Sequence, residues 1–218
     1  MTTTDAPRTG WAEIDTLDEL TALVGEPTQM VKDKVRPALL DVDRDWLAAT
    51  PFCVLATADA EGRCDASPKG DPAGSLVHVI DDRTIAIAER PGNRRVDGYR
   101  NVVVNPHVGL NFLIPGRTDT LRINGRARLV TEAPFFDEMI VKGHRPILAL
   151  VVEIEEIFFH CGKAFLRSKL WDPETWDPEA RVPRRAVVAS RVERAGADLA
   201  ELDEYYDPGN YEKRLYTT

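Results

Sequence analysis

Cysteine is scarce in this sequence, and its distribution narrows the kinds of site that the chain can build. Only three cysteines occur among 218 residues, namely Cys53, Cys64 and Cys161. Their number is odd, and they form neither a C-x-x-C pair nor a spacing typical of metal ligands. We therefore predict no metal site, and a reducing compartment, the cytoplasm, as the simplest location.

Long apolar runs and common catalytic motifs are also absent. No stretch approaches the roughly 20 residues of a membrane helix. The N-terminal sequence MTTTDAPRTGWAEIDTLDEL has no basic segment followed by an apolar one, so we expect neither a signal peptide nor a membrane partner. H-E-x-x-H, G-x-S-x-G and Walker-type glycine loops do not occur. The formal net charge of -8 disfavours general nucleic-acid binding, which requires a positive field.

What the sequence does contain is a helical beginning followed by many short strands. Thr16, with Glu19 three residues later, predicts a capped helix, and Asp43 predicts the cap of a second helix that stops before Thr50-Pro51. Strands are expected at residues 52–57, 63–69, 76–80, 84–89, 108–114, 120–130 and 147–159, with a helix at 133–142. This order predicts a mainly β fold with peripheral helices, either a barrel or a sandwich.

The chain is long enough for one domain with extensions. We place an N-terminal helical extension at residues 1–50 and the β domain at residues 51–175. Residues 176–218 are expected to form a linker, rich in proline and charge, and a C-terminal helix and tail. Ser190 and Glu193 form a possible capping box for that helix, which would run to about Tyr205. The aromatic but polar tail beyond it is expected to pack on the body or on a partner subunit.

Residues 89–113, ERPGNRRVDGYRNVVVNPHVGLNFL, are the most informative stretch of the chain. They predict a strand end, a turn with two adjacent arginines, a short helix, an Asn-Pro break and a new strand. Arg94 and Arg95 would lie near a helix start, where free N–H groups and the helix dipole favour an anion. With Asn93 they predict a phosphate site. The alternative is an exposed basic turn.

Two further stretches could line a cofactor. Pro68 inside the strand-like run Asp65–Asp71 forces an edge or a bulge, which can present backbone groups to a flat heterocycle, with Lys69 as a cation beside it. Thr120 begins a strand in which polar and apolar residues alternate, so that one polar face is available. The alternatives are an irregular strand end and a half-solvated strand.

The segment HCGKAFLRSKLW, residues 160–171, gathers several reactive side chains. His160 and Cys161 are adjacent on a strand and would point to opposite faces, which argues against a nucleophile–base pair. Arg167 and Trp171 are four residues apart and would share a helix face, suited either to a planar ligand or to a structural cation–π pair. The other three histidines, scattered and without carboxylate partners at useful spacing, are interpreted as structural or surface residues: His78, His107 and His144.

These pieces, in this order, resemble the pyridoxamine 5′-phosphate oxidase-like flavoproteins, the FMN-binding split β-barrel family. The similarity covers roughly residues 51–171, with Ala66-Ser67-Pro68-Lys69-Gly70, the Asn93–Arg95 turn and Arg122-Ile123-Asn124-Gly125 at the family's positions. The resemblance implies a split β-barrel, FMN as cofactor, and a homodimer with FMN at the interface. It implies that the FMN phosphate is held by Asn93, Arg94 and Arg95, that Ser67, Pro68 and Lys69 line the isoalloxazine, that Thr120 reaches the flavin, and that Arg167, Ser168 and Trp171 close the site, from the second subunit.

The resemblance predicts an FMN-dependent oxidoreductase that acts on an unidentified small molecule. Lys69 is the candidate for stabilising the reduced flavin electrostatically, and no residue stands out as an obligatory acid or base. HCGKAFLRSKLWDP stands where authentic pyridoxamine phosphate oxidases carry an arginine–histidine substrate motif, so vitamin B6 oxidation is not implied. The alternatives are an FMN-binding or flavin-sensing protein without efficient turnover, and a split barrel that binds deazaflavin F420 or haem.

Overall fold

The computed structural model describes residues 10–177 and 182–216 and divides the chain into two compact units, residues 1–35 and 36–218. The first unit holds α1 (Leu17–Val24) and the short α2 (Gln29–Asp33). The predicted capping box of α1 is confirmed, because the Thr16 hydroxyl accepts the Glu19 N–H while the Glu19 carboxylate accepts the Thr16 N–H. No helix in the described ranges is long and apolar enough to cross a membrane.

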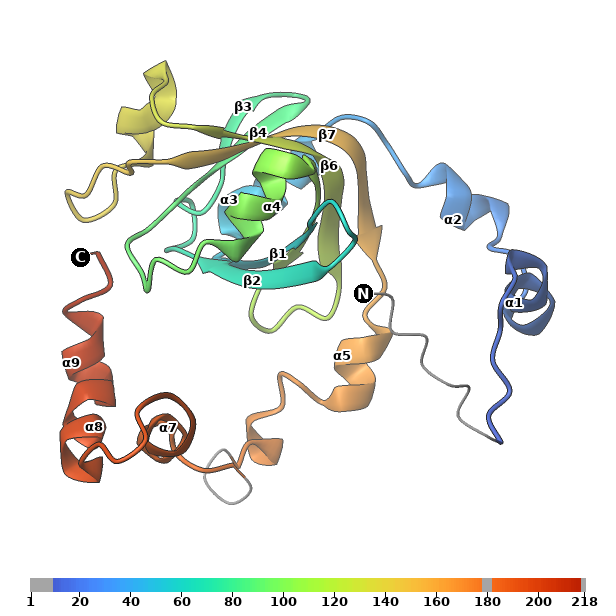
Figure 1. Cartoon of the computed structure of the whole chain (residues 1–218). Helices are drawn as coiled ribbons and strands as arrows, with labels where there is room; N and C mark the ends of the chain where they lie inside the picture. The colour runs from blue at the N-terminus through green and yellow to red at the C-terminus, as the bar shows by residue number, and fades with distance from the viewer. Residues whose placement is uncertain (1–9, 178–181, 217–218) are drawn as a thin grey trace. The chain divides into compact units, whose positions relative to one another are not determined.

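The second unit is built on one antiparallel sheet of seven strands (Figure 1). In sheet order the strands are β2 (Cys64–Gly70), β1 (Phe52–Ala58), β5 (His107–Leu113), β6 (Thr120–Val130), β7 (Ala149–His160), β4 (Thr84–Ala88) and β3 (His78–Asp81). Every predicted strand is present within two residues of its expected bounds. The predicted mainly β architecture with peripheral helices is confirmed.

Alternation along the strands places the main core inside the curved sheet. In β1 and β5 every second side chain is buried, as the period of two requires when one face is covered. The largest fully buried side chains of this core include Leu55, Leu110, Phe112, Ile123 and Ile157. In β7 four consecutive residues, 149–152, are buried, since a second cluster with Phe136 and Met139 covers its other face. These two residues belong to η1 (Pro134–Met139), a 3₁₀ helix and not the longer helix predicted at 133–142.

Helix α3 (Asp41–Ala49) closes the core from the N-terminal side, but it begins earlier than predicted. Leu40 is its N-cap, and Asp43 is a buried residue of the first turn rather than the cap. The Asp43 carboxylate accepts the Leu40 N–H at 2.8 Å and forms a two-bond ion pair with the Arg36 guanidinium at 2.6 and 2.9 Å. Asp43 therefore stabilises the helix start through its side chain from inside the helix.

Short helices make up the C-terminal part of the second unit: α5 (Lys163–Ser168), η2 (Pro173–Thr175), α7 (Arg185–Val188), η3 (Ala189–Glu193), α8 (Leu199–Tyr206) and α9 (Pro208–Glu212). The predicted Ser190 capping box is wrong. Ser190 lies inside the π-helical turn η3, and the helix through Tyr205 starts later, capped by Asp198, whose carboxylate accepts the N–H groups of Ala200 and Glu201.

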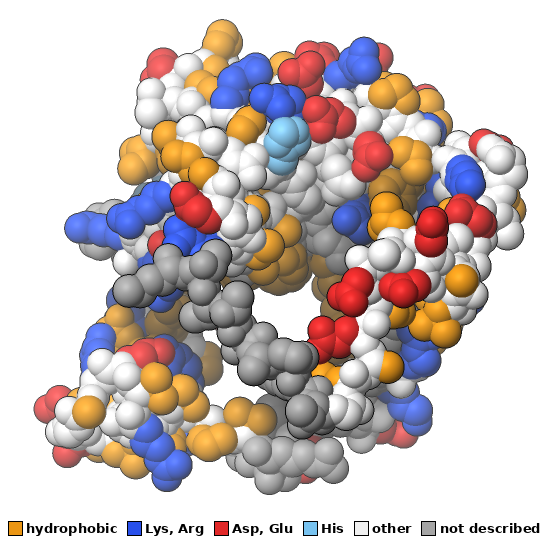
Figure 2. All heavy atoms as spheres, turned by 45° about the vertical axis from the view of Figure 1, so that its right-hand side comes forward, with side chains coloured by type: hydrophobic (Ala, Val, Ile, Leu, Met, Phe, Trp, Pro, Cys, Tyr) orange, Lys and Arg blue, Asp and Glu red, His pale blue; other side chains and the backbone are white. Residues whose placement is uncertain are grey.

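The predicted domain limits at residues 51 and 175 stay a prediction. Residues 1–9 of the expected N-terminal extension and 178–181 of the expected linker lie outside the described residues. Over the described surface that faces the viewer in Figure 2, basic and acidic side chains are interspersed and form no continuous basic field.

Candidate functional site

A cavity of about 390 Å³ lies between strand β2 and the turn that follows β4. It brings together five of the residues singled out from the sequence: Ser67, Pro68, Lys69, Asn93 and Arg95. The remaining polar lining includes the carboxylates of Asp65, Asp71, Glu89 and Asp97 and the guanidinium of Arg90. Its volume lies within the ~300–1,000 Å³ range typical of small-molecule sites.

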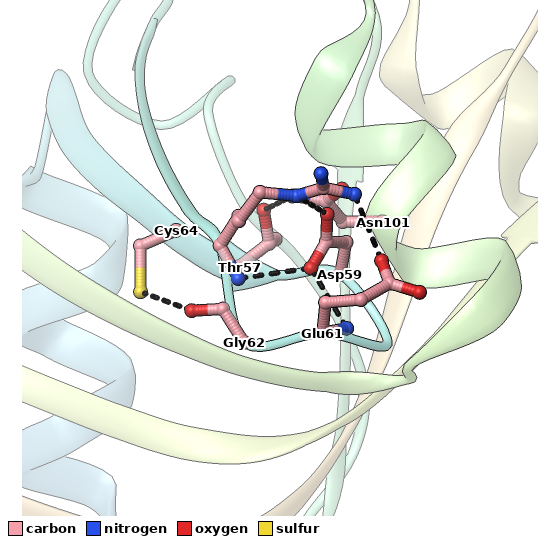
Figure 3. Close-up of polar contacts among 7 residues, drawn as sticks. Thr57, Asp59, Glu61, Gly62, Cys64 and Asn101 are labelled. Carbon is pink, nitrogen blue, oxygen red and sulfur yellow. Dashed lines mark hydrogen bonds and ion pairs between the residues drawn. The ribbon is translucent and has the colours of Figure 1, made fainter. Parts of the chain in front are cut away.

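Strand β2 presents the first group of residues because it is an edge strand. It pairs only with β1, in a register that places Pro68 opposite Val54, so the missing N–H of proline is tolerated as predicted. The hairpin loop before β2 is fixed by Asp59, whose carboxylate accepts the backbone N–H groups of Glu61 and Arg63 and pairs with the Arg63 guanidinium (Figure 3).

The turn at residues 93–95 presents the second group. The Asn93 side-chain oxygen accepts the Arg95 N–H at 2.9 Å, and Arg94 between them has a left-handed backbone with φ of 61°. Helix α4 (Asp97–Val104) begins directly afterwards, as the sequence predicted. The Arg95 guanidinium donates to Asp97 at 2.5 Å, and this bond raises the pKa of Arg95.

Helix α4 approaches the sheet closely because of Gly98. A Cβ at this position would lie 3.1 Å from an Asp65 carboxylate oxygen and 3.5 Å from the hydroxyl oxygens of Ser67 and Thr57. One turn later, the Asn101 amide donates to the Thr57 hydroxyl at 3.0 Å (Figure 3). The start of α4 is thus held against β1 and against β2, the strand that carries the Ser67–Lys69 wall of the cavity.

Lys69 belongs to a partly buried cluster of three polar side chains. Its ammonium donates to Glu89 at 2.8 Å and lies 4.4 Å from the centre of the Tyr99 ring. The Tyr99 hydroxyl donates to the same Glu89 carboxylate oxygen at 2.6 Å. Burial, followed by the charge of Glu89, raises the pKa of Tyr99, so the phenol stays a hydrogen-bond donor. Glu89 therefore fixes Lys69 at the wall of the cavity.

Arg90 and Asp71 form the best-shielded ion pair of the cavity. The Arg90 Nε donates to Asp71 at 2.6 Å, and the side chains are only 12% and 3% exposed. Arg90 Nη2 donates to the carbonyl oxygen of Met139 at 2.9 Å, whereas Nη1 is buried with no hydrogen-bond partner among the described residues. An unused buried donor is costly, so this nitrogen marks a place where a ligand acceptor would be favourable.

A second cavity, of about 400 Å³, adjoins the first, and Glu89, Arg90 and Gly92 line both. Arg94 lines this second cavity rather than the first. The two adjacent arginines predicted to hold one phosphate are therefore directed to different cavities. The division coincides with the left-handed backbone at Arg94.

The chain is similar to a known protein family. The profile of the family described as Pyridoxamine 5'-phosphate oxidase matches residues 39–161, more than half of the chain. The chain belongs to the pyridoxamine 5′-phosphate oxidase family. No curated protein matches it.

Several solved structures resemble this member of the pyridoxamine 5′-phosphate oxidase family in part. HupZ from Group A Streptococcus has 21% identity over 56% of this chain and 93% of its own, with a TM-score of 0.44. A putative pyridoxamine 5'-phosphate oxidase from Lactobacillus delbrueckii has 22% identity over 56% and 95%, also with a TM-score of 0.44. HutZ, the haem storage protein from Vibrio cholerae, has 16% identity over 55% and 91%, with a TM-score of 0.40. The family match over residues 39–161 and the seven-stranded antiparallel sheet confirm the predicted fold class.

Besides Arg94, four predicted residues of this pyridoxamine 5′-phosphate oxidase-family chain do not line the first cavity. Thr120 is buried at the start of β6. In and after α5, the Trp171 indole donates to the Arg117 carbonyl oxygen at 2.7 Å, and the Ser168 hydroxyl donates to the Phe165 carbonyl oxygen at 3.2 Å. Arg167 lies exposed on the same helix. The predicted contact of Thr120 with a flavin, and that of Arg167, Ser168 and Trp171 from a second subunit, stay predictions.

Sequence reasoning passed over the carboxylates and the tyrosine that organise the site: Asp65, Asp71, Glu89, Asp97 and Tyr99. The sequence contains little indication of their role, because an isolated acidic residue in a turn or a tyrosine in a helix is common in proteins. Asp65 and Asp71 do flank the Ser67–Lys69 run, and Asp97 follows Arg95 by two residues, so a search for internal partners of the cations would have found them.

The cysteines and histidines contribute no metal centre within residues 10–177 and 182–216. Cys53 is buried, and burial raises the pKa of its thiol to about 12. His78 stacks on Phe135, and the Arg126 guanidinium lies 3.1 Å from the His107 ring.

Proposed function

We propose that this protein is an FMN-dependent oxidoreductase acting on a small molecule. One observation carries the proposal: the Ser67–Lys69 strand and the Asn93–Arg95 turn, distant in the sequence, form two walls of a single cavity. Family membership supports the same cofactor, since these are the positions that the resemblance assigned to the isoalloxazine and to the phosphate.

Four carboxylates and three cations line the cavity, and each cation is paired with a carboxylate, so an anionic cofactor needs a cation that can exchange its partner. Glu89 is bound by Lys69, Asp71 by Arg90, Asp97 by Arg95, and Asp65 accepts the Ser67 hydroxyl at 2.7 Å. Arg95 is 78% exposed, and exposed ion pairs contribute little stability, so a phosphate can replace Asp97 there. The start of α4 supplies further favourable N–H groups.

FMN, when bound, supplies the hydride-transfer chemistry. The protein's part is to hold and orient. Arg95 and Asn93 would hold the phosphate, and the edge strand through Pro68 would lie along the ring system. Lys69, fixed by Glu89, would place a positive charge beside it and stabilise a reduced, anionic ring. A cytoplasmic homodimer is part of the proposal: a partner's Arg167, Ser168 and Trp171 would then complete a site that one chain leaves open.

The test begins with the ligand that copurifies with the protein. We expect a flavin absorption spectrum and, after denaturation, the mass of FMN. A deazaflavin, a haem or no saturable FMN binding would overturn the proposal. Sedimentation analysis should give twice the mass of the 24.3 kDa chain.

The two arginines offer a matched pair of variants. Arg95→Ala should weaken FMN binding by about tenfold or more, because charge-assisted bonds to phosphate are among the strongest. Arg94→Ala, which removes the same charge from the neighbouring residue, should change affinity by less than about threefold, the residual effect of a screened charge. Asp97→Asn removes the competing carboxylate and should strengthen binding. Equal losses from both arginine variants would refute the assignment of the phosphate to Arg95.

A further inference from the structure

Tyr216, in the segment after α9, lies on the wall between the two cavities. Figure 1 shows this segment running from α9 toward the loop between η1 and β7, and the contacts agree. The Tyr216 ring stacks on His144 with centroids 5.8 Å apart and planes 18° apart, and the Lys142 ammonium lies 5.5 Å from its centre. The tail therefore packs on the body, one of the two outcomes expected from the sequence.

The hydroxyl of Tyr216 reaches the most shielded charged pair of the site. It donates to Asp71 Oδ1 at 2.8 Å, and the other oxygen of Asp71 accepts from Arg90. Burial, together with this bond to Asp71, raises the pKa of Tyr216, so the phenol keeps its proton and stays a donor. Tyr216 thus donates a hydrogen bond to the Asp71 carboxylate, whose side chain is only 3% exposed.

The space beside Tyr216 is apolar and open. The second cavity is walled by Pro91, Val96, Pro146, Ile147 and Leu148, together with Tyr216 itself. Ile147 is 83% exposed, which is unusual for a large aliphatic side chain in a cavity wall. Arg90 also lines this cavity, and Asp71, which accepts the Tyr216 hydroxyl, lines the first cavity. A ring with a polar substituent that enters the apolar space would therefore reach Asp71 only where Tyr216 has left.

We propose that the second cavity binds an aromatic compound carrying a hydroxyl donor, and that Tyr216 occupies the position of that group as a substitute supplied by the chain itself. The ligand's hydroxyl would take the place of the phenol on Asp71, and its ring would lie over His144. Tyr216 lies only four residues after the end of α9 at Glu212, so it can leave without unwinding that helix.

This inference deepens the proposed function by naming the substrate class, because Arg90 and Glu89 belong to both cavities. Binding of the ring itself does not require a flavin. The failure of one proposal is therefore distinguishable from the failure of the other.

The experiment uses 4-fluorophenol, a mimic of the tyrosine side chain, and follows its binding to the full chain by ¹⁹F NMR. We expect Tyr216→Ala to bind the probe at least about tenfold more tightly than the unaltered protein, because the substitution vacates the position. Fluorobenzene has the ring but no hydrogen-bond donor, so its affinity should increase much less on the same substitution. Adding Asp71→Asn to Tyr216→Ala should reduce the affinity for 4-fluorophenol again.

A folded Tyr216→Ala protein that binds 4-fluorophenol no better than the unaltered protein would overturn the inference. Equal binding of fluorobenzene and 4-fluorophenol would do the same, and this comparison needs no substitution at the buried Asp71. FMN titration of the same variants gives an independent measurement. Normal FMN binding with no phenol binding would refute the substrate class alone, whereas phenol binding without FMN binding would refute the cofactor alone.

Discussion

Gly125 is the position at which the structure predicts the largest effect of adding a single methyl group. It lies on β6 at an irregularity in the β6–β7 register, where Asn124 pairs with Glu156 and Gly125 pairs with Ile154. A Cβ at this position would overlap the Glu153 carbonyl oxygen and lie 3.0 Å from its carbonyl carbon. Because a Cβ has no torsion that could relieve the overlap, the backbone of two central strands must separate.

The expected cost follows from that separation. Overpacking costs about 1–3 kcal/mol, and losing one or two ladder hydrogen bonds adds about 0.5–1.5 kcal/mol each. We expect Gly125→Ala to lower the free energy of unfolding by about 3 kcal/mol, measured by urea denaturation followed through tryptophan fluorescence. For a chain of this length the melting temperature should fall by roughly 6–12 °C.

Gly109 provides the matched control, because it lies on the adjacent strand β5 and pairs with Asn124. A Cβ there would meet the Asn124 side-chain oxygen at 3.4 Å and the Ala56 Cβ at 3.9 Å, which are ordinary contacts. Gly109→Ala should therefore stay within about 1 kcal/mol of the unaltered protein. If Gly125→Ala also stays within that range at an unchanged denaturant slope, the account of the bulge is refuted.

Two further predictions concern buried groups near the cavity. Tyr99→Phe keeps the ring but removes its hydrogen bond to Glu89, so we expect a loss of about 1–2 kcal/mol in urea denaturation, and no loss would contradict the bond. Cys53 has a pKa raised by burial to about 12, so its thiolate forms only as the pH nears that value. At pH 8 iodoacetamide should alkylate the two exposed cysteines but not Cys53, as read by peptide mass spectrometry, and modification of all three in urea is the control.

The strands of the sheet could be predicted because each one is encoded by the pattern of apolar and polar residues within its own segment. Alternation in β1 and β5 and the long run of β7 follow directly from which faces are buried. The two helix-capping errors have one cause. Asp43 and Ser190 were assigned as caps from spacing alone, but the same residue types also occur inside a first turn or a π turn. Which of two nearby candidates caps a helix is decided by packing, here the cluster of Ala186, Ala189 and Leu202.

Only those parts of the site that lie within one continuous segment could be predicted from the sequence. Ser67–Lys69 and Asn93–Arg95 each carry their own turn or edge chemistry, so each segment could be recognised by itself. Arg94 and Arg95 line different cavities, and this separation coincides with a left-handed backbone at Arg94 that two adjacent arginines do not predict. The bond between Tyr216 and Asp71 joins residues 145 positions apart, and no local pattern encodes it.

The location of the anion site follows from exposure rather than from the number of arginines. Three cations line the first cavity, and each is paired with a carboxylate: Lys69 with Glu89, Arg90 with Asp71 and Arg95 with Asp97. Breaking a shielded pair leaves an uncompensated charge, which is strongly unfavourable, whereas exchanging a partner at the surface costs little. The Arg90 and Lys69 side chains are 12% and 18% exposed, against 78% for Arg95. The proposed phosphate would therefore bind at Arg95, while the two shielded pairs keep their partners and fix the shape of the cavity.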